Sequence, residues 1–216
     1  MRARCFTKLI ISFIILSLLF ALYRPIAFSN NEILPLCAIK GGTDGYIYVP
    51  NLSVNRLKIQ LWCNDANPTR MWGDQTGGVS PYPNIPEFPD GKVDIMDVGL
   101  ISSLFGKSEG DPDWNYMADC VPDRTINIRD LAKASNNYGQ IGGSYTTDLT
   151  GIKVVFNTGE EVYPNADGFL NIPPGATSFI VKRYDTPVMA LVYFFKEELA
   201  VEVKKKPIMD GFVLVE

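Results

Sequence analysis

The chain has 216 residues, of which 46% are hydrophobic and 20% are charged, and its formal net charge is −4. This length allows one domain or two small ones with a real core, and the slightly acidic balance gives no basis for a nucleic-acid partner. The chain has no histidine, which removes the commonest general base and transition-metal ligand, and its four cysteines show no zinc-type spacing.

Residues 1–29 are expected to be a signal peptide or an N-terminal membrane anchor. Three basic residues precede the apolar run 9–23, which Arg24 interrupts. The run is closer in length to the core of a signal peptide than to a span of about 20 residues. A signal peptidase would cut before Asn30; if the segment is retained, it is the only expected membrane contact. Both alternatives predict a secreted or cell-surface protein.

The next segments have the character of strands. Residues 45–49 and 57–62 are short, rich in β-branched and aromatic side chains, and separated by turn residues. In 57–62 apolar and polar side chains alternate, which is typical of a sheet with one buried face. Residues 64–89 are rich in Asn, Pro, Gly and Asp without a period, which predicts a linker.

The stretch 90–139 contains one pattern twice. The segment Val93–Val98 recurs as Ile126–Leu131, 33 residues later and in one register, so the stretch is an internal duplication. Each copy places oxygen-bearing side chains at spacings of four and three before an apolar run with helical period. A loop of this kind suits calcium, which takes about six to eight oxygen ligands in flexible geometry.

Compared with a twelve-residue EF-type loop, the copies supply a set of candidate calcium ligands for up to two ions. The set comprises acidic or amide side chains at positions one, five, nine and twelve and a backbone carbonyl at position seven. In the first copy the candidates are Asp90, Lys92 (carbonyl), Asp94 and Asp97, and in the second they are Asp119, Asp123, Thr125 (carbonyl), Asn127 and Asp130.

The copies also depart from that frame. Pro86 falls at position one of the first copy, which therefore lacks its first ligand unless Asn84 or Glu87 supplies an oxygen. In the second copy Arg124 stands where the turn normally requires glycine, so its backbone is expected to be strained. The alternative to two calcium sites is a degenerate repeat that keeps the helices and has lost its ions.

With these two loop–helix halves, residues 84–140 resemble the dockerin family. Dockerins consist of two such halves without the leading helix of a full EF-hand, and the linker 110–119 is similar to their connection between halves. The resemblance implies calcium binding and a cohesin-like protein partner. The core of the helical pair is expected to include Val98, Ile101, Leu104 and Phe105.

Strand patterns resume after residue 145, so we expect a mostly β fold. We predict that residues 32–64 and 145–216 form one discontinuous β-sandwich, from which the small α-helical, dockerin-like module projects on Gly-rich joints. The expected strands of the second part are 151–156, 160–163, 168–172, 178–182, 188–195 and 199–203.

Catalysis is not expected. The carboxylate pairs at 160–161 and 197–198 are expected to be solvated charges at strand ends, and adjacent side chains on a strand point to opposite faces and cannot act on one substrate atom. No nucleophile motif or phosphate-binding glycine loop is present. The pattern therefore favours a non-catalytic calcium-binding protein whose dockerin-like module mediates extracellular attachment or scaffolding.

Two alternatives remain open. One is a structural subunit of a surface layer or filament, in which the terminal strand 212–216 pairs with another copy of the chain. The other is an accessory protein that binds polysaccharide through stacking aromatics. The candidate aromatics are Trp62, Trp72, Tyr82, Trp114 and Tyr116.

Overall fold

The computed structural model describes residues 33–41, 46–63 and 71–196. The N-terminal segment and the strands expected at 199–203 and 212–216 lie outside these ranges. Within them, no helix combines the length and the apolar character that crossing a bilayer requires.

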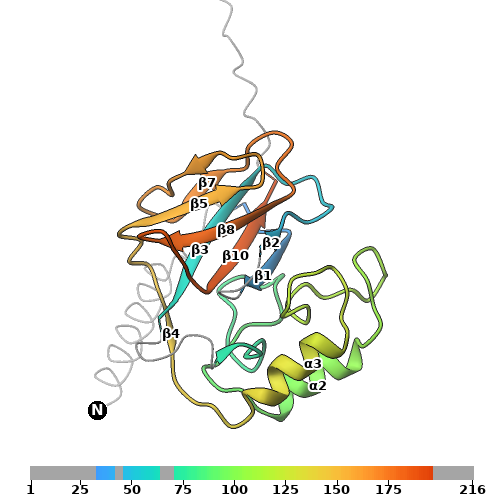
Figure 1. The fold of residues 1–216 in the computed structure, drawn as a ribbon. Helices are drawn as coiled ribbons and strands as arrows, with labels where there is room; N and C mark the ends of the chain where they lie inside the picture. The colour runs from blue at the N-terminus through green and yellow to red at the C-terminus, as the bar shows by residue number, and fades with distance from the viewer. Residues whose placement is uncertain (1–32, 42–45, 64–70, 197–216) are drawn as a thin grey trace, which may run out of the picture. The chain divides into compact units, whose positions relative to one another are not determined.

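Two antiparallel sheets form the body of the protein (Figure 1), so the prediction of a mostly β fold is confirmed. Sheet A has the strand order β1-β10-β3-β4, with β7 also paired to β3. Its strands are β1 (Cys37–Gly41), β3 (Arg56–Cys63), β4 (Ser144–Thr146), β7 (Phe169–Asn171) and β10 (Ala190–Phe195). Sheet B has the order β2-β8-β5-β6, with β9 paired to β8. Its strands are β2 (Ile47–Tyr48), β5 (Ile152–Phe156), β6 (Glu161–Val162), β8 (Ser178–Arg183) and β9 (Thr186–Pro187).

An apolar core joins the two sheets. The alternating positions Leu57, Ile59 and Leu61 of β3 point into it and are almost fully buried, as the alternation predicted. From sheet B the core receives side chains such as Val154 of β5 and Phe179 of β8. Fully burying each such side chain contributes about 1.5–3 kcal/mol.

The outer face of sheet A is also covered. Every residue of β10 is buried, and its outward side chains Leu191 and Tyr193 pack against Tyr82 and Ile85. Residues 71–89 therefore lie against the sheet, and the prediction that this segment is only a linker is wrong for its described part. The Pro- and Gly-rich composition that suggested a linker instead allows an irregular chain to follow the sheet surface.

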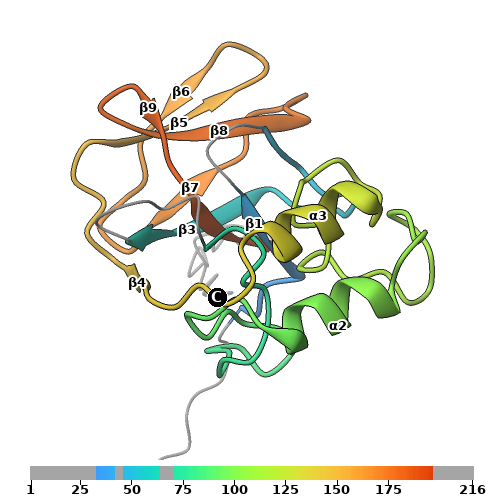
Figure 2. The same cartoon turned by 60° about the horizontal axis from the view of Figure 1, so that its bottom comes forward.

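Two helices, α2 (Ile95–Ser103) and α3 (Ile128–Asn136), lie side by side next to the sheets (Figure 2). A second apolar core joins them to the body, because it contains Trp62 of β3 and Met189 together with Ile101 and Ala134 of the helices. The helical pair is thus packed against sheet A, and the prediction that it projects on Gly-rich joints is wrong.

Candidate metal-binding loops

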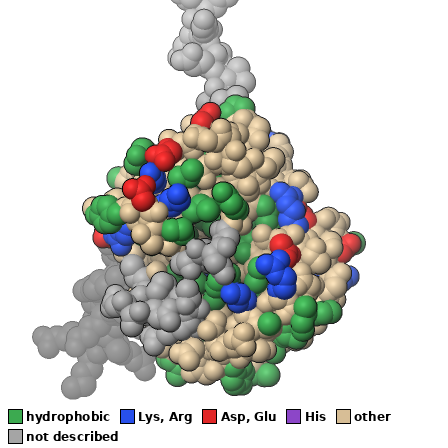
Figure 3. Space-filling model, viewed as in Figure 1, with side chains coloured by type: hydrophobic (Ala, Val, Ile, Leu, Met, Phe, Trp, Pro, Cys, Tyr) green, Lys and Arg blue, Asp and Glu red, His purple; other side chains and the backbone are tan. Residues whose placement is uncertain are grey.

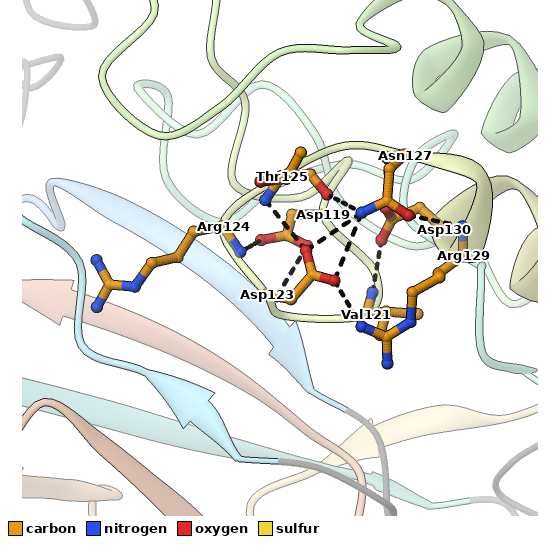
Figure 4. A network of polar contacts seen from close by, with 8 residues as sticks. All are labelled: Asp119, Val121, Asp123, Arg124, Thr125, Asn127, Arg129 and Asp130. Carbon is orange, nitrogen blue, oxygen red and sulfur yellow. Dashed lines mark hydrogen bonds and ion pairs between the residues drawn. The ribbon is translucent and has the colours of Figure 1, made fainter.

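The second loop of the duplicated segment is held by two buried carboxylates (Figure 4). Asp119 accepts hydrogen bonds from the backbone N–H of Asp123 (3.2 Å) and of Arg124 (2.8 Å). Asp130 accepts from the N–H of Val121 (2.7 Å) and of Asn127 (2.8 Å). The carboxylates at the two ends of the loop therefore fix the backbone between them.

The middle of the loop presents polar oxygens and an amide. Asn127 caps α3 through its side chain, which accepts from the N–H of Arg129, and its amide nitrogen donates to the Thr125 carbonyl at 2.9 Å. Asp123 pairs with the Arg129 guanidinium at 2.7 Å. An ion that binds the Thr125 carbonyl therefore has to share this oxygen with the Asn127 amide or displace the amide.

Arg124 has the positive φ that its position in the loop predicted, at 71°. Its guanidinium forms an ion pair with Glu109, donates to the Val49 carbonyl at 2.9 Å and lies over the Tyr48 ring. These contacts offset the backbone strain of a non-glycine residue with positive φ, which is about 1–2 kcal/mol. They also attach the second loop to the sheets.

The two end carboxylates of the second loop lack a counter-charge. Asp119 and Asp130 are fully buried, and neither forms an ion pair with a Lys or Arg among the described residues. Burial, with the nearby charge of Asp130, raises the pKa of Asp119 to about 7. Burial likewise raises the pKa of Asp130. A bound cation would remove this unfavourable burial of like charges.

A buried hydroxyl from the sheets faces the same site. The Tyr48 Oη atom makes no hydrogen bond of ordinary geometry, yet it interacts with the Asp119 carboxylate. Burial is the main cause of the raised pKa of Tyr48, and the charge of Asp119 adds to it. The second loop therefore has a buried hydroxyl from the sheets close to its first carboxylate.

The first loop has the same frame. Asp94 caps α2 by accepting from the Met96 N–H at 2.8 Å, and Asp97 accepts from the Asp94 N–H at 2.9 Å. Asp90 accepts from the Lys92 N–H at 2.9 Å, and the Lys92 ammonium lies 3.7 Å from the other oxygen of Asp90. The structure therefore places the four predicted residues of this copy in one loop.

Asp74 belongs to this loop, although the sequence pattern did not reveal it. Its carboxylate accepts from the N–H of Asp90 at 3.1 Å and of Gly91 at 3.2 Å. The alternatives considered from sequence lie differently, since the Asn84 amide donates to the Pro35 carbonyl and Glu87 accepts from the Thr76 hydroxyl. Asp74 is of a residue type that binds calcium, but in the sequence it lies too far from Asp90 to be assigned to a contiguous twelve-residue loop.

A buried lysine of β1 approaches the first loop. The Lys40 ammonium donates to the carbonyls of Met71 (2.9 Å) and Asp74 (2.5 Å) and stands 3.8 Å from Asp74 Oδ2. Burial lowers the pKa of Lys40, and the charges of Asp74 and Asp97 oppose that effect. Burial also raises the pKa of Asp74 to about 7, although Lys40 works against it.

The donors in both loops fit a hard cation. They are carboxylate, amide and carbonyl oxygens, which calcium prefers, and they include none of the nitrogen or sulfur ligands that zinc takes. Among the described residues, no three His, Cys, Asp or Glu side chains already converge as a metal-holding group. The fit therefore rests on mixed oxygen donors and, in the second loop, on two buried carboxylates that form no ion pair among the described residues.

The aromatics proposed for sugar stacking are mostly core residues. Trp62, Trp72 and Tyr82 are buried, with the Trp72 indole N–H donating to the Cys120 carbonyl. Trp114 and Tyr116 are half-buried and line a groove of about 480 Å³ beside α2. The described structure thus leaves two of the five candidates near the surface.

Comparisons with family models, with curated proteins and with solved structures found no match to this chain.

Proposed function

We propose that this chain is an exported, non-catalytic calcium-binding protein whose helical pair attaches it to a partner protein outside the cell. Its loops 84–140 would form a dockerin-like module inserted into a β-sandwich made of 32–64 and 145–216. The observation that carries the proposal is the second loop, in which two buried carboxylates share one frame and neither pairs with a Lys or Arg of the described residues. Calcium bound there would supply that charge.

The ligands assigned to calcium in the second loop are side-chain oxygens of Asp119, Asp123, Asn127 and Asp130 and the Thr125 carbonyl. Both oxygens of Asp119 and both oxygens of Asp130 already accept from backbone N–H groups, so the two carboxylates need little further ordering when the ion binds. When bound, the ion would neutralise the carboxylates and hold the start of α3 against the loop. Millimolar calcium, which is common outside cells, suits loops of this kind.

Matching hydrophobic side chains on the two halves support the attachment role. Ile95 and Ile128, at equivalent loop positions, are 66% and 64% exposed. Phe105 and Tyr138, at the equivalent ends of the helices, are 53% and 55% exposed. Phe105 is thus a surface residue, not the core residue predicted from its spacing. Exposed hydrophobic side chains in green lie over the region of the helical pair (Figure 3). A repeated apolar surface on an otherwise packed module is a feature of interaction sites.

Calcium binding is tested by titrating the purified, chelator-treated chain and recording its melting temperature. At 100 times the dissociation constant, an ion that binds only the folded state stabilises it by about 2.7 kcal/mol. For a chain of this size that raises the midpoint by roughly 5–10 °C. Magnesium at equal ionic strength and the exposed Asp167→Asn variant are the controls. No calcium-specific rise would leave the degenerate-repeat alternative.

Attachment is tested with a purified cohesin module, the partner class that the family resemblance implies. We expect calcium-dependent binding that Ile95→Asp with Ile128→Asp abolishes while calcium affinity is retained. Sedimentation of the chain alone in calcium tests a second copy as the partner. Absence of both associations would refute the attachment role without affecting the proposal of calcium binding.

A further inference from the structure

The first loop is interrupted by a chain excursion. The third loop position in the second copy is Val121, and a single residue, Pro122, separates it from Asp123. In the first copy the thirteen residues 77–89 stand in place of that proline. The excursion is closed at its base by the Gly77–Pro89 bridge and by the Gly78 N–H donating to the Phe88 carbonyl at 2.7 Å.

When the excursion is left out of the comparison, the two loops have equivalent hydrogen bonds at positions one, three, five, six and twelve. Asp74 accepts from the N–H groups at positions five and six, as Asp119 does in the second loop. The N–H of Thr76 donates to Asp97 Oδ1 at 3.0 Å, as that of Val121 donates to Asp130 Oδ1. Asp74 therefore occupies position one, and Thr76 occupies position three.

Position six of the two loops agrees as well. Gly91 has φ at 87° and Arg124 has φ at 71°, so the chain makes the same left-handed turn in both. The turn whose N–H groups donate to Asp74 is therefore the same turn that donates to Asp119.

We infer that the first loop is a complete calcium site assembled from two separate segments of the chain. Its ligands are the side chains of Asp74, Thr76, Asp90, Asp94 and Asp97 and the Lys92 carbonyl. The inference rests on the proposed function and corrects the sequence frame, which assigned position one to Pro86. The frame read from the sequence assigned more candidate ligands to the second loop than to the first. With Asp74 and Thr76 included, the first loop has more, because Thr76 offers a hydroxyl oxygen at position three and Val121 offers none.

Buried polar groups around the first loop support a ligand there. The side chains of Asp74 and Asp97 are 0% and 1% exposed. Gln75, which lies between Asp74 at position one and Thr76 at position three, is also fully buried. Neither the oxygen nor the nitrogen of the Gln75 side-chain amide has a hydrogen-bond partner among the described residues. Buried polar atoms without partners are rare in folded proteins and commonly mark the place of an ion or an ordered water.

Lys40 modulates this site without replacing the ion. Its ammonium is held by two backbone carbonyls, and its positive charge acts on Asp74 and Asp97, two of the four carboxylates of the loop. The Lys92 ammonium lies 3.7 Å from Asp90. The loop therefore retains a net negative charge that favours a divalent cation. The fixed positive charge near Asp74 is expected to weaken binding at the first loop relative to a site with the same ligands and no lysine.

The test is calcium titration calorimetry on the full chain, with the ion itself as the probe. We expect two ions for the unaltered chain, and one ion each for Asp74→Asn and for Asp119→Asn. Binding of two ions by the Asp74→Asn variant would overturn the inference. So would binding of a single ion by the unaltered chain, if Asp119→Asn abolishes it and Asp74→Asn does not. Either result would leave the proposed function intact. No binding at all would overturn the proposed function itself.

Reciprocal substitutions at position three give a second test that does not depend on removing a buried charge. Thr76→Val places in the first loop the residue that the second loop already accommodates, and Val121→Thr does the reverse. We expect Thr76→Val to weaken the first site by roughly tenfold and Val121→Thr to strengthen the second. Unchanged binding in Thr76→Val, with its fold intact by near-ultraviolet circular dichroism, would overturn the split site.

Discussion

Replacing Asp119 with asparagine is expected to stabilise the calcium-free protein at pH 8. The carboxylate is fully buried, and burial with the charge of Asp130 raises its pKa from 3.8 to about 7. The folded protein therefore binds this proton more tightly than the unfolded chain does. As a result, the contribution of Asp119 to stability is greatest below pH 4 and is lost as the pH rises through about 7.

The size of the effect follows from the pKa and the hydrogen bonds. A shift from 3.8 to about 7 corresponds to about 4 kcal/mol of destabilisation once the group is ionised. Asparagine removes that charge, but its single oxygen cannot accept from both the Asp123 and Arg124 N–H groups, which costs about 1–2 kcal/mol. The net expectation for Asp119→Asn at pH 8 is a gain of about 2 kcal/mol.

Urea unfolding at pH 4 and pH 8, with chelator and with calcium, measures this prediction. We expect Asp119→Asn to be more stable than the unaltered chain at pH 8 in chelator, and less stable than it in calcium. At pH 4 the gain should disappear. Equal destabilisation at both pH values, with or without calcium, would show that the carboxylate acts only through its hydrogen bonds; Asp167→Asn, at an exposed aspartate, is the control.

Three further outcomes are expected. Arg124→Gly relieves the positive φ but leaves Glu109, whose side chain is 4% exposed, without its ion-pair partner; we expect a net loss of about 1–2 kcal/mol in urea unfolding, and a gain would contradict the anchoring role. Trp72→Phe removes the buried N–H that donates to the Cys120 carbonyl and should destabilise by about 2–3 kcal/mol, with a change below about 0.5 kcal/mol refuting that contact. Cys37 and Cys120 are free and buried, and burial raises the pKa of both thiols. We therefore expect maleimide to label them only after unfolding. Rapid labelling of these two cysteines in the native chain, detected by mass spectrometry, would contradict this.

Alternating strands were predictable from the sequence, and of the longer strands buried throughout, β10 was expected at 188–195 while β1 was not. The alternation at Leu57, Ile59 and Leu61 located β3 to within a residue or two. β1 (Cys37–Gly41) was missed because all five residues are buried and no period marks them. Period-two patterns report only on sheets with one solvated face.

The candidate site was predictable wherever its residues are contiguous. The spacing of Asp94 and Asp97 revealed a loop followed by a helix, because the same carboxylates cap α2 and close the loop. Asp74 was not found, because the thirteen-residue excursion removes it from any fixed spacing. The contacts of Lys40 and Tyr48 were not accessible either, since they depend on how the sheets meet the loops.

The packing of the helical pair on sheet A has a mechanical consequence. Trp62 and Met189 share a core with α2 and α3, and the outer side chains of β10 are covered by residues 71–89. Tension applied through a partner bound to the helices is therefore transmitted to the sheet by side-chain packing as well as along the backbone. The helices cannot swing away from the sheet without exposing this shared core to water.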